Sequence, residues 1–92
     1  MGKKQTQKAK RHLFTLWPPA HAEIVLLAGT FTGWNPVPMS RRHDGRFHIS
    51  LRLEPGIHEY KFIADGQWII DPLHSNWALN PFGSINSVLR ID

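Results

Sequence analysis

Alternating apolar and polar side chains predict a chain built from short β-strands. The alternation is strict in residues 47–53, which predicts one face in the core and one in solvent. Residues 22–29 are almost entirely apolar and rich in branched side chains, which predicts a strand covered on both faces, the best candidate for the centre of a sheet. Residues 13–17 and 86–91 predict a first and a last strand, and the prolines after residue 17 place the first at an edge.

The stretch from Tyr60 to Trp68 predicts a hairpin around which the rest of the chain is organised. Its first half alternates, so Tyr60 and Lys61 point to opposite sides of the strand. Asp65-Gly66 is favoured in two-residue turns, because both central residues there need positive φ. Trp68 is therefore expected near Lys61, an aromatic plate beside a long hydrogen-bond donor, and this pair predicts the start of a ligand platform.

Two loops rich in turn residues carry large aromatic side chains. Residues 30–38 contain one glycine and two prolines and carry Trp34, and residues 73–83 are predicted as a long loop with Trp77 and Phe82. There is no segment of helical period and no internal repeat. About six or seven short strands in so small a chain predict an all-β fold, an antiparallel β-sandwich of immunoglobulin-like type.

Length and composition limit the size of the domain and exclude some kinds of protein. Ninety-two residues make one domain with one core. Cysteine is absent, which excludes disulfides and thiolate metal sites. No apolar run approaches the roughly 18 residues of a membrane span, and no signal peptide is evident. We therefore expect no membrane span and a cytoplasmic location.

The net charge of +4 belongs to the N-terminal end of the chain. Five of the eleven basic residues lie within residues 1–11, whereas residues 13–92 carry six basic and seven acidic side chains. A lysine-rich segment poor in apolar residues cannot repay its ordering entropy, so residues 1–11 are predicted to be a disordered basic tail and residues 12–92 the folded domain. The alternative for the tail is a polyanion-binding arm.

Signals of enzymatic chemistry are hard to find. The six histidines show no metal-binding spacing, and we expect neither a metal nor a cofactor. Asp65 and Asp71 lie in turn-forming dipeptides, where local backbone hydrogen bonding is the ordinary role of a carboxylate. Neither a nucleophile motif nor a phosphate-binding glycine loop is present. The sequence therefore predicts no catalytic residues and no enzymatic activity.

Three segments closely resemble a known carbohydrate-binding family. They are Gly29-Thr30-Phe31-Thr32-Gly33-Trp34, then Gly56-x-His58-x-Tyr60-Lys61-Phe62-x-x-Asp65-Gly66-x-Trp68-x-x-Asp71-Pro72, and Gly83-Ser84-Ile85-Asn86. The pattern is similar to the glycogen-binding domain of the AMP-activated protein kinase β subunit. More broadly it resembles carbohydrate-binding module family 48, the early-set domain that precedes the catalytic barrel in isoamylases, pullulanases and glycogen-branching enzymes. The resemblance implies a non-catalytic module that binds α-1,4-linked glucans such as glycogen, starch, maltooligosaccharides and cyclodextrin.

The resemblance also implies which residues bind sugar. The two tryptophans that stack on glucose in the family match Trp34 and Trp68. The lysine that donates to sugar hydroxyls matches Lys61, and the asparagine that hydrogen-bonds the same sugars matches Asn86. The apolar loop residue that enters the ring of a cyclic glucan matches Phe82.

The residues themselves support this interpretation. A glucose ring offers a face of C–H groups and a rim of hydroxyls, so a binder needs exposed flat aromatics and a few orienting polar groups. Trp34 and Trp68 follow turn glycines closely and are expected to be exposed, whereas Trp17 is expected in the core. Trp77 is an additional candidate for the site.

Two functional hypotheses remain at this point. One is the glucan-binding module, whose partners are an α-glucan and a catalytic or kinase chain, with no specific nucleic acid. The other is a protein-interaction domain of the same fold with an idle sugar site.

Overall fold

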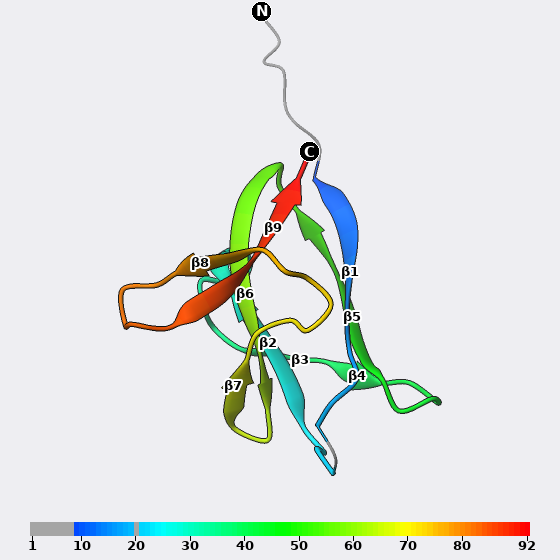
Figure 1. Cartoon of the computed structure of the whole chain (residues 1–92). Helices are drawn as coiled ribbons and strands as arrows, with labels where there is room; N and C mark the ends of the chain where they lie inside the picture. The colour runs from blue at the N-terminus through cyan, green and yellow to red at the C-terminus, as the bar shows by residue number, and fades with distance from the viewer. Residues whose placement is uncertain (1–8, 20) are drawn as a thin grey trace, which may run out of the picture.

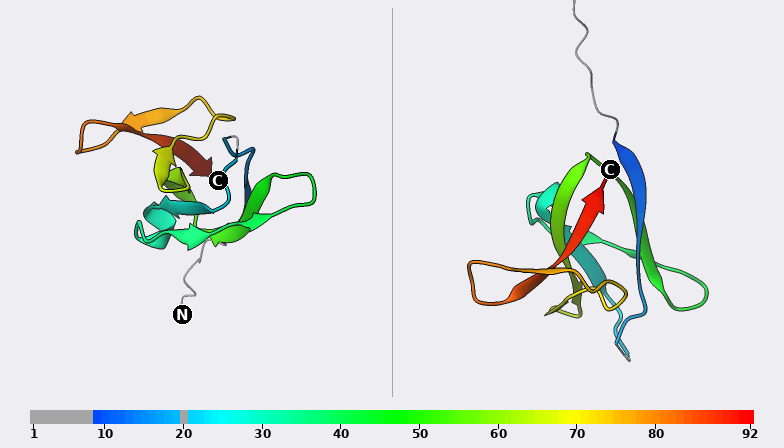
Figure 2. Two further views of the ribbon diagram at one scale, coloured as in Figure 1. Left: turned by 90° about the horizontal axis from the view of Figure 1, so that it is seen from below. Right: turned by 45° about the horizontal axis from the view of Figure 1, so that its top comes forward.

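Each long strand buries one row of side chains, and these rows meet between two antiparallel sheets (Figures 1 and 2). The computed structural model describes residues 9–19 and 21–92. One sheet has the order β1-β5-β4, and the other β3-β2-β6-β9-β8, with β7 also paired to β6. The strands are β1 Lys10–Leu16, β2 Val25–Gly29, β3 Val37–Pro38, β4 Ser40–Arg41, β5 Phe47–Leu53, β6 Gly56–Ala64, β7 Gln67–Ile69, β8 Trp77–Leu79 and β9 Ile85–Ile91, and a short 3-10 helix, η1, spans Thr30–Thr32. The predicted antiparallel β-sandwich is confirmed.

The centre of the larger sheet is β6, not the segment 22–29 that the sequence favoured. One edge of β6 pairs with β2, and its other edge pairs first with β9 and then with β7. β2 begins only at Val25, because the amides of Glu23 and Ile24 donate instead to Oδ1 of Asp65, at 3.1 and 2.9 Å. Asp65 thus ties the start of β2 to the hairpin turn between β6 and β7.

β1 lies at a sheet edge, as its flanking prolines predict, but the core role expected for Trp17 is wrong. Phe14 and Leu16 alternate into the core, so the next side chain points outward and Trp17 is 58% exposed. The guanidinium of Arg46 covers its ring at 5.5 Å. β1 begins at Lys10, two residues before the boundary predicted from composition, and residues 1–8 of the predicted tail lie outside the described residues.

The segment 73–83 is not one long loop, as the sequence predicted. Its middle forms β8, which pairs with β9 and places Ala78 opposite Asn86. A three-residue strand carries almost no signal of its own, and the neighbouring β9 supplies the hydrogen-bonding edge that extends it. The two strands form a hairpin that projects from the sandwich (Figure 1).

A small polar cluster is buried next to the apolar core. The Tyr60 hydroxyl donates to Oδ2 of Asp71 at 2.6 Å, and the Asp71 amide donates to Oγ of Ser87 at 2.7 Å. The other carboxylate oxygen of Asp71 accepts the local bond from the Leu73 amide, at 2.9 Å. Burial, and then the hydrogen bond and negative charge of Asp71, raises the pKa of Tyr60, which therefore stays a donor at neutral pH. The cluster joins β6, β9 and the chain that follows β7.

Tyr60→Phe should destabilise the fold by about 1–3 kcal/mol, because it leaves the buried Asp71 carboxylate without one of its donors. Urea unfolding measures the change. Ser75→Ala, which removes an exposed hydroxyl from the same loop, is the control and should leave the midpoint unchanged. Equal midpoints for Tyr60→Phe and the wild type would show that the hydrogen bond contributes nothing net.

Candidate functional site

Trp34 is held by a tight turn at the end of β2. After η1, Gly33 and Trp34 both have a φ of 62°, and the Trp34 amide donates to the Gly29 carbonyl at 2.8 Å. Gly29 has to be glycine, because a Cβ there would lie 2.6 Å from the Glu59 carbonyl oxygen. Two consecutive residues in the left-handed region turn the chain sharply, and the indole is presented beside β6.

Lys61 and Trp68 lie on one face of the β6–β7 hairpin. Asp65 and Gly66 have φ values of 47° and 86°, which confirms the predicted two-residue turn. Trp68 pairs with Ile63, and Ile63 shares its side of β6 with Lys61, so the indole and the lysine point to the same side. Trp68 is 48% exposed on this support.

The tip between β8 and β9 is organised by Asn80. Its Oδ1 accepts hydrogen bonds from the amides of Phe82 and Ser84, at 2.9 and 3.1 Å. Its Nδ2 donates to Oγ of Ser84 at 2.8 Å and to Oδ1 of Asn86 at 3.1 Å. One side chain therefore shapes the turn that carries Phe82 and also fixes the orientation of the Asn86 amide.

The polar groups continue as one chain of hydrogen bonds toward β6. Nδ2 of Asn86 donates to Oε1 of Glu59 at 2.9 Å, and Nζ of Lys61 donates to Oγ of Ser84 at 3.1 Å. Asn86 is only 5% exposed, so most of its hydrogen-bonding groups are used within this network. The carboxylate of Glu59 and the ammonium of Lys61 lie on the same side of β6 and balance each other in charge.

These elements enclose an open cleft of about 700 Å³. Its lining combines aromatic and apolar side chains with hydroxyl, amide, carboxylate and ammonium groups: Thr30, Trp34, Glu59, Lys61, Trp68, Asn80, Pro81, Phe82, Ser84 and Asn86. Phe82 stands at the tip with 91% of its surface exposed. Flat apolar plates beside a few oriented donors and acceptors suit a ligand that has apolar faces and a hydroxyl rim.

The structure brings together five of the six residues singled out from the sequence. Trp77 is the exception: it pairs with Ser87 while its neighbour Ala78 pairs with Asn86, so the Trp77 side chain points to the opposite face of the sheet. It is 57% exposed there and does not line the cleft.

Sequence reasoning missed Glu59 and Asn80. The signal for Asn80 was present, since Asn80-Pro81 followed by Gly83 is a turn pattern in which the asparagine side chain bonds the backbone ahead of it. Glu59 follows from the alternation of β6 once the face of Lys61 is known. Within residues 9–19 and 21–92, no group of three histidine, aspartate or glutamate side chains is placed to hold a metal ion.

The comparison with protein families agrees with this geometry. Residues 14–92 match the family described as the glycogen recognition site of AMP-activated protein kinase. The chain belongs to this glycogen-recognition family.

Relatives include plant and animal proteins. The chain is 49% identical over 59 residues to protein PTST homolog 2, chloroplastic, of Arabidopsis thaliana, covering 63% of this chain and 11% of that protein. It is 45% identical over 82 residues to protein FLOURY ENDOSPERM 6, chloroplastic, of Oryza sativa subsp. japonica, covering 88% and 15%. It is 36% identical over 67 residues to the 5'-AMP-activated protein kinase subunit beta-1 of Sus scrofa, covering 73% and 53%. The chain thus spans about half or less of these relatives.

Solved structures support the fold independently. The maltogenic amylase from S. marinus superimposes with a TM-score of 0.76 at 23% identity, over 100% of this chain and 15% of that chain. A pullulanase from Paenibacillus barengoltzii matches with a TM-score of 0.56 at 21% identity, over 96% of this chain and 15% of that chain. The same sandwich fold is therefore also found as a part of much longer chains.

Asn80→Ala should weaken glucan binding by about 1–2 kcal/mol, because it releases the turn that carries Phe82 and frees the Asn86 amide to rotate. Isothermal titration with maltoheptaose measures the loss. Asn76→Ala is the matched control, since Asn76 is exposed and does not line the cleft. Equal affinity of the two variants would show that Asn80 does not position the site.

Proposed function

We propose that this domain binds α-1,4-linked glucans in the cleft between the β2–η1 turn, the β6–β7 hairpin and the β8–β9 tip. The observation that carries the proposal is that Trp34, Lys61, Trp68, Phe82 and Asn86, assigned from a sequence resemblance, line one cleft. Membership of the glycogen-recognition family supports it.

The side chains make different kinds of contact with the sugar. Trp34 and Trp68 stack on the apolar faces of glucose units, and their burial on binding supplies most of the affinity. Lys61 donates to sugar hydroxyls and Glu59 accepts from them, while Asn86 contributes the hydrogen-bonding capacity left over from its network. Phe82, on the projecting tip, contacts the ring interior of a helical or cyclic glucan.

The domain acts without catalysis. Glycoside hydrolysis requires two carboxyl groups on either side of the bond, and Glu59 is the single carboxylate among the residues that line the cleft. The carboxylate of Asp65 is occupied by the amides of Glu23 and Ile24, and that of Asp71 is buried against Tyr60. Any catalytic activity of a larger assembly would come from a partner chain.

A catalytic or kinase chain is the partner that the relatives suggest, since one of them is named as a subunit of 5'-AMP-activated protein kinase. Where this assembly would lie in the cell stays a prediction, because the plant relatives are named as chloroplastic and the sequence favoured the cytoplasm. No helix among the described residues is long and apolar enough to cross a bilayer.

Trp34→Ala and Trp68→Ala should each weaken binding to maltoheptaose or β-cyclodextrin by more than about 1 kcal/mol while the fold stays intact. The chain supplies its own matched controls: Trp17→Ala and Trp77→Ala remove exposed tryptophans that do not line the cleft, and both should bind as the wild type does. Titration by calorimetry measures all four variants. An equal loss of affinity in the control variants would place the sugar outside the cleft. No loss in the cleft variants would favour the protein-interaction hypothesis, in which the sugar site is idle.

Pure protein should release no reducing sugar from starch or glycogen, because one carboxylate in the cleft cannot serve as both acid and base or nucleophile. A reducing-end assay over several hours tests this, with Glu59→Gln as the comparison. Hydrolysis by the wild type that Glu59→Gln abolishes would overturn the non-catalytic assignment.

A further inference from the structure

The β1-β5-β4 sheet, with its connecting turn, carries most of the basic side chains of the described residues. The β1-β5-β4 sheet and its connecting turn, residues 10–16 and 40–53, hold six basic side chains and one acidic, which are Lys10, Arg11, Arg41, Arg42, Arg46, Arg52 and Asp44. The remaining described residues hold two basic and six acidic side chains, which are Lys61, Arg90, Glu23, Glu54, Glu59, Asp65, Asp71 and Asp92. Five of these six acids lie in turns, loops or the C-terminus rather than in strands. The glucan cleft lies on the larger sheet, and the β1-β5-β4 sheet presents its outer face on the far side of the sandwich (Figure 2).

Two arginines face each other on that outer face. Arg11 of β1 pairs directly with Arg52 of β5, and like charges at opposed positions repel. Their guanidinium groups are nevertheless held in place: Nη1 of Arg11 donates to Oγ of Ser50 at 3.4 Å, and Nη2 of Arg52 donates to the Ala9 carbonyl at 3.3 Å. An anion between the two forks would offset the repulsion, and both forks keep N–H groups to donate.

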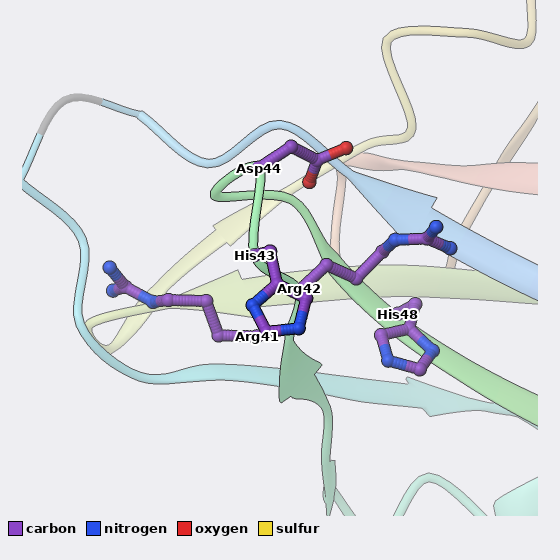
Figure 3. Close-up of a pocket in the computed structure, with 5 residues that line it drawn as sticks. All are labelled: Arg41, Arg42, His43, Asp44 and His48. Carbon is purple, nitrogen blue, oxygen red and sulfur yellow. The ribbon is translucent and has the colours of Figure 1, made fainter.

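A second cationic cluster lies at the other end of the same face. Arg41, Arg42, His43, Asp44 and His48 line an open cleft of about 510 Å³. Figure 3 shows Arg42 extending to the same side as His48, while Arg41 points the other way. Arg41 is already engaged, since its Nη2 donates to the Ala22 carbonyl at 2.8 Å and its guanidinium lies 4.9 Å from the Phe47 ring centre.

The single carboxylate in this sheet does not neutralise the cluster. Oδ2 of Asp44 accepts from Nε and Nη2 of Arg46 at 3.1 and 2.9 Å, and its Oδ1 accepts from the Arg46 amide at 3.0 Å. These bonds lower the pKa of Asp44, so it remains an ion paired with Arg46. Arg42 and the Arg11–Arg52 pair are left as the cationic groups of the face.

We propose that the outer face of the β1-β5-β4 sheet is a second binding site, which takes phosphate monoesters carried on α-glucan. The planar guanidinium fork matches phosphate oxygens in pairs, which a lone ammonium does not. The Arg42 amide donates to the Arg46 carbonyl, so Arg42 lies level with Arg46. Arg46 precedes Arg52 by six positions in the chain, a span of about 20 Å. A chain bearing several phosphates can therefore engage both ends of the face at once.

A phosphate on glucan fits better than a free anion, and this step depends on the proposed glucan binding. Exposed ion pairs are individually weak, so a small phosphate would be held poorly. A polymer that also occupies the cleft on the other sheet presents its phosphates at high effective concentration. The binding free energies of the two weak sites then reinforce each other.

The test compares amylopectin that carries phosphate monoesters with the same polymer after phosphatase treatment. The full chain should bind the phosphorylated form about three- to tenfold more tightly at low salt, and the preference should vanish at high salt. Replacing both Arg42 and Arg52 by alanine should abolish the preference and leave affinity for the dephosphorylated polymer unchanged. Arg90→Ala is the charge control, because Arg90 lies on the other sheet and pairs with Asp92, and it should keep the preference.

Equal affinity of the wild type for the two polymers would overturn the proposal. So would a preference that survives in the Arg42 and Arg52 double variant. Tighter binding to a single-stranded oligonucleotide or to anionic phospholipid vesicles than to phosphorylated amylopectin would assign the face to another polyanion and would likewise overturn it. Failure of the cleft is a separate result, since it would appear as loss of binding to the dephosphorylated polymer.

Discussion

The buried hydrogen bond from Tyr60 to Asp71 connects the parts of this molecule that would otherwise be independent. Tyr60 lies at the middle of β6, where the pairing with β2 and β9 meets, and Asp71 lies just beyond β7. The bond holds the chain against the core after the hairpin, and the Asp71 amide is fixed in turn by Ser87 of β9. Trp68 and Asn86, which belong to different strands, are therefore kept at a fixed separation.

Alternation along β6 then decides what each side of the sheet does. The side that carries Tyr60 and Phe62 is buried, so the side that carries Glu59 and Lys61 faces out. Rigid strands supply the polar groups of the cleft, whereas the Trp34 turn and the tip around Phe82 supply aromatic surface from either flank. A site whose polar groups lie on the sheet and whose aromatic side chains lie on or next to tight turns loses little entropy on binding.

Charge is distributed in the same two-sided way. The cleft balances one lysine against one glutamate, which suits a neutral sugar, and the cationic groups gather on the outer face of the other sheet. In a count over the whole sequence the excess of positive charge falls in the N-terminal segment, because seven acidic side chains cancel the six basic ones elsewhere. The charges cancel in the count but are separated in space. The basic side chains gather on the β1-β5-β4 sheet, whereas most of the acidic ones lie in turns and loops outside it.

Local sequence determined much of this protein. Strict alternation in residues 47–53, the Asp65-Gly66 turn and the prolines after Trp17 act between near neighbours. They therefore predicted a strand, the hairpin and the sheet edge without knowledge of the fold. The resemblance named the five residues that the cleft brings together. The exposure of Trp17 was mispredicted because hydrophobicity was weighed there ahead of the alternation that places Phe14 and Leu16 inside.

Only the tertiary structure decided the remaining features, because each depends on partners distant in the chain. β6 became the central strand since three strands pair with its two edges, and β2 was shortened by the carboxylate of Asp65, about forty residues away. β8 exists because β9 offers it an edge, and that pairing turns Trp77 away from the cleft. The place of Glu59 in the network, and the meeting of Arg11 with Arg52, follow from strand register, which a single sequence does not encode locally.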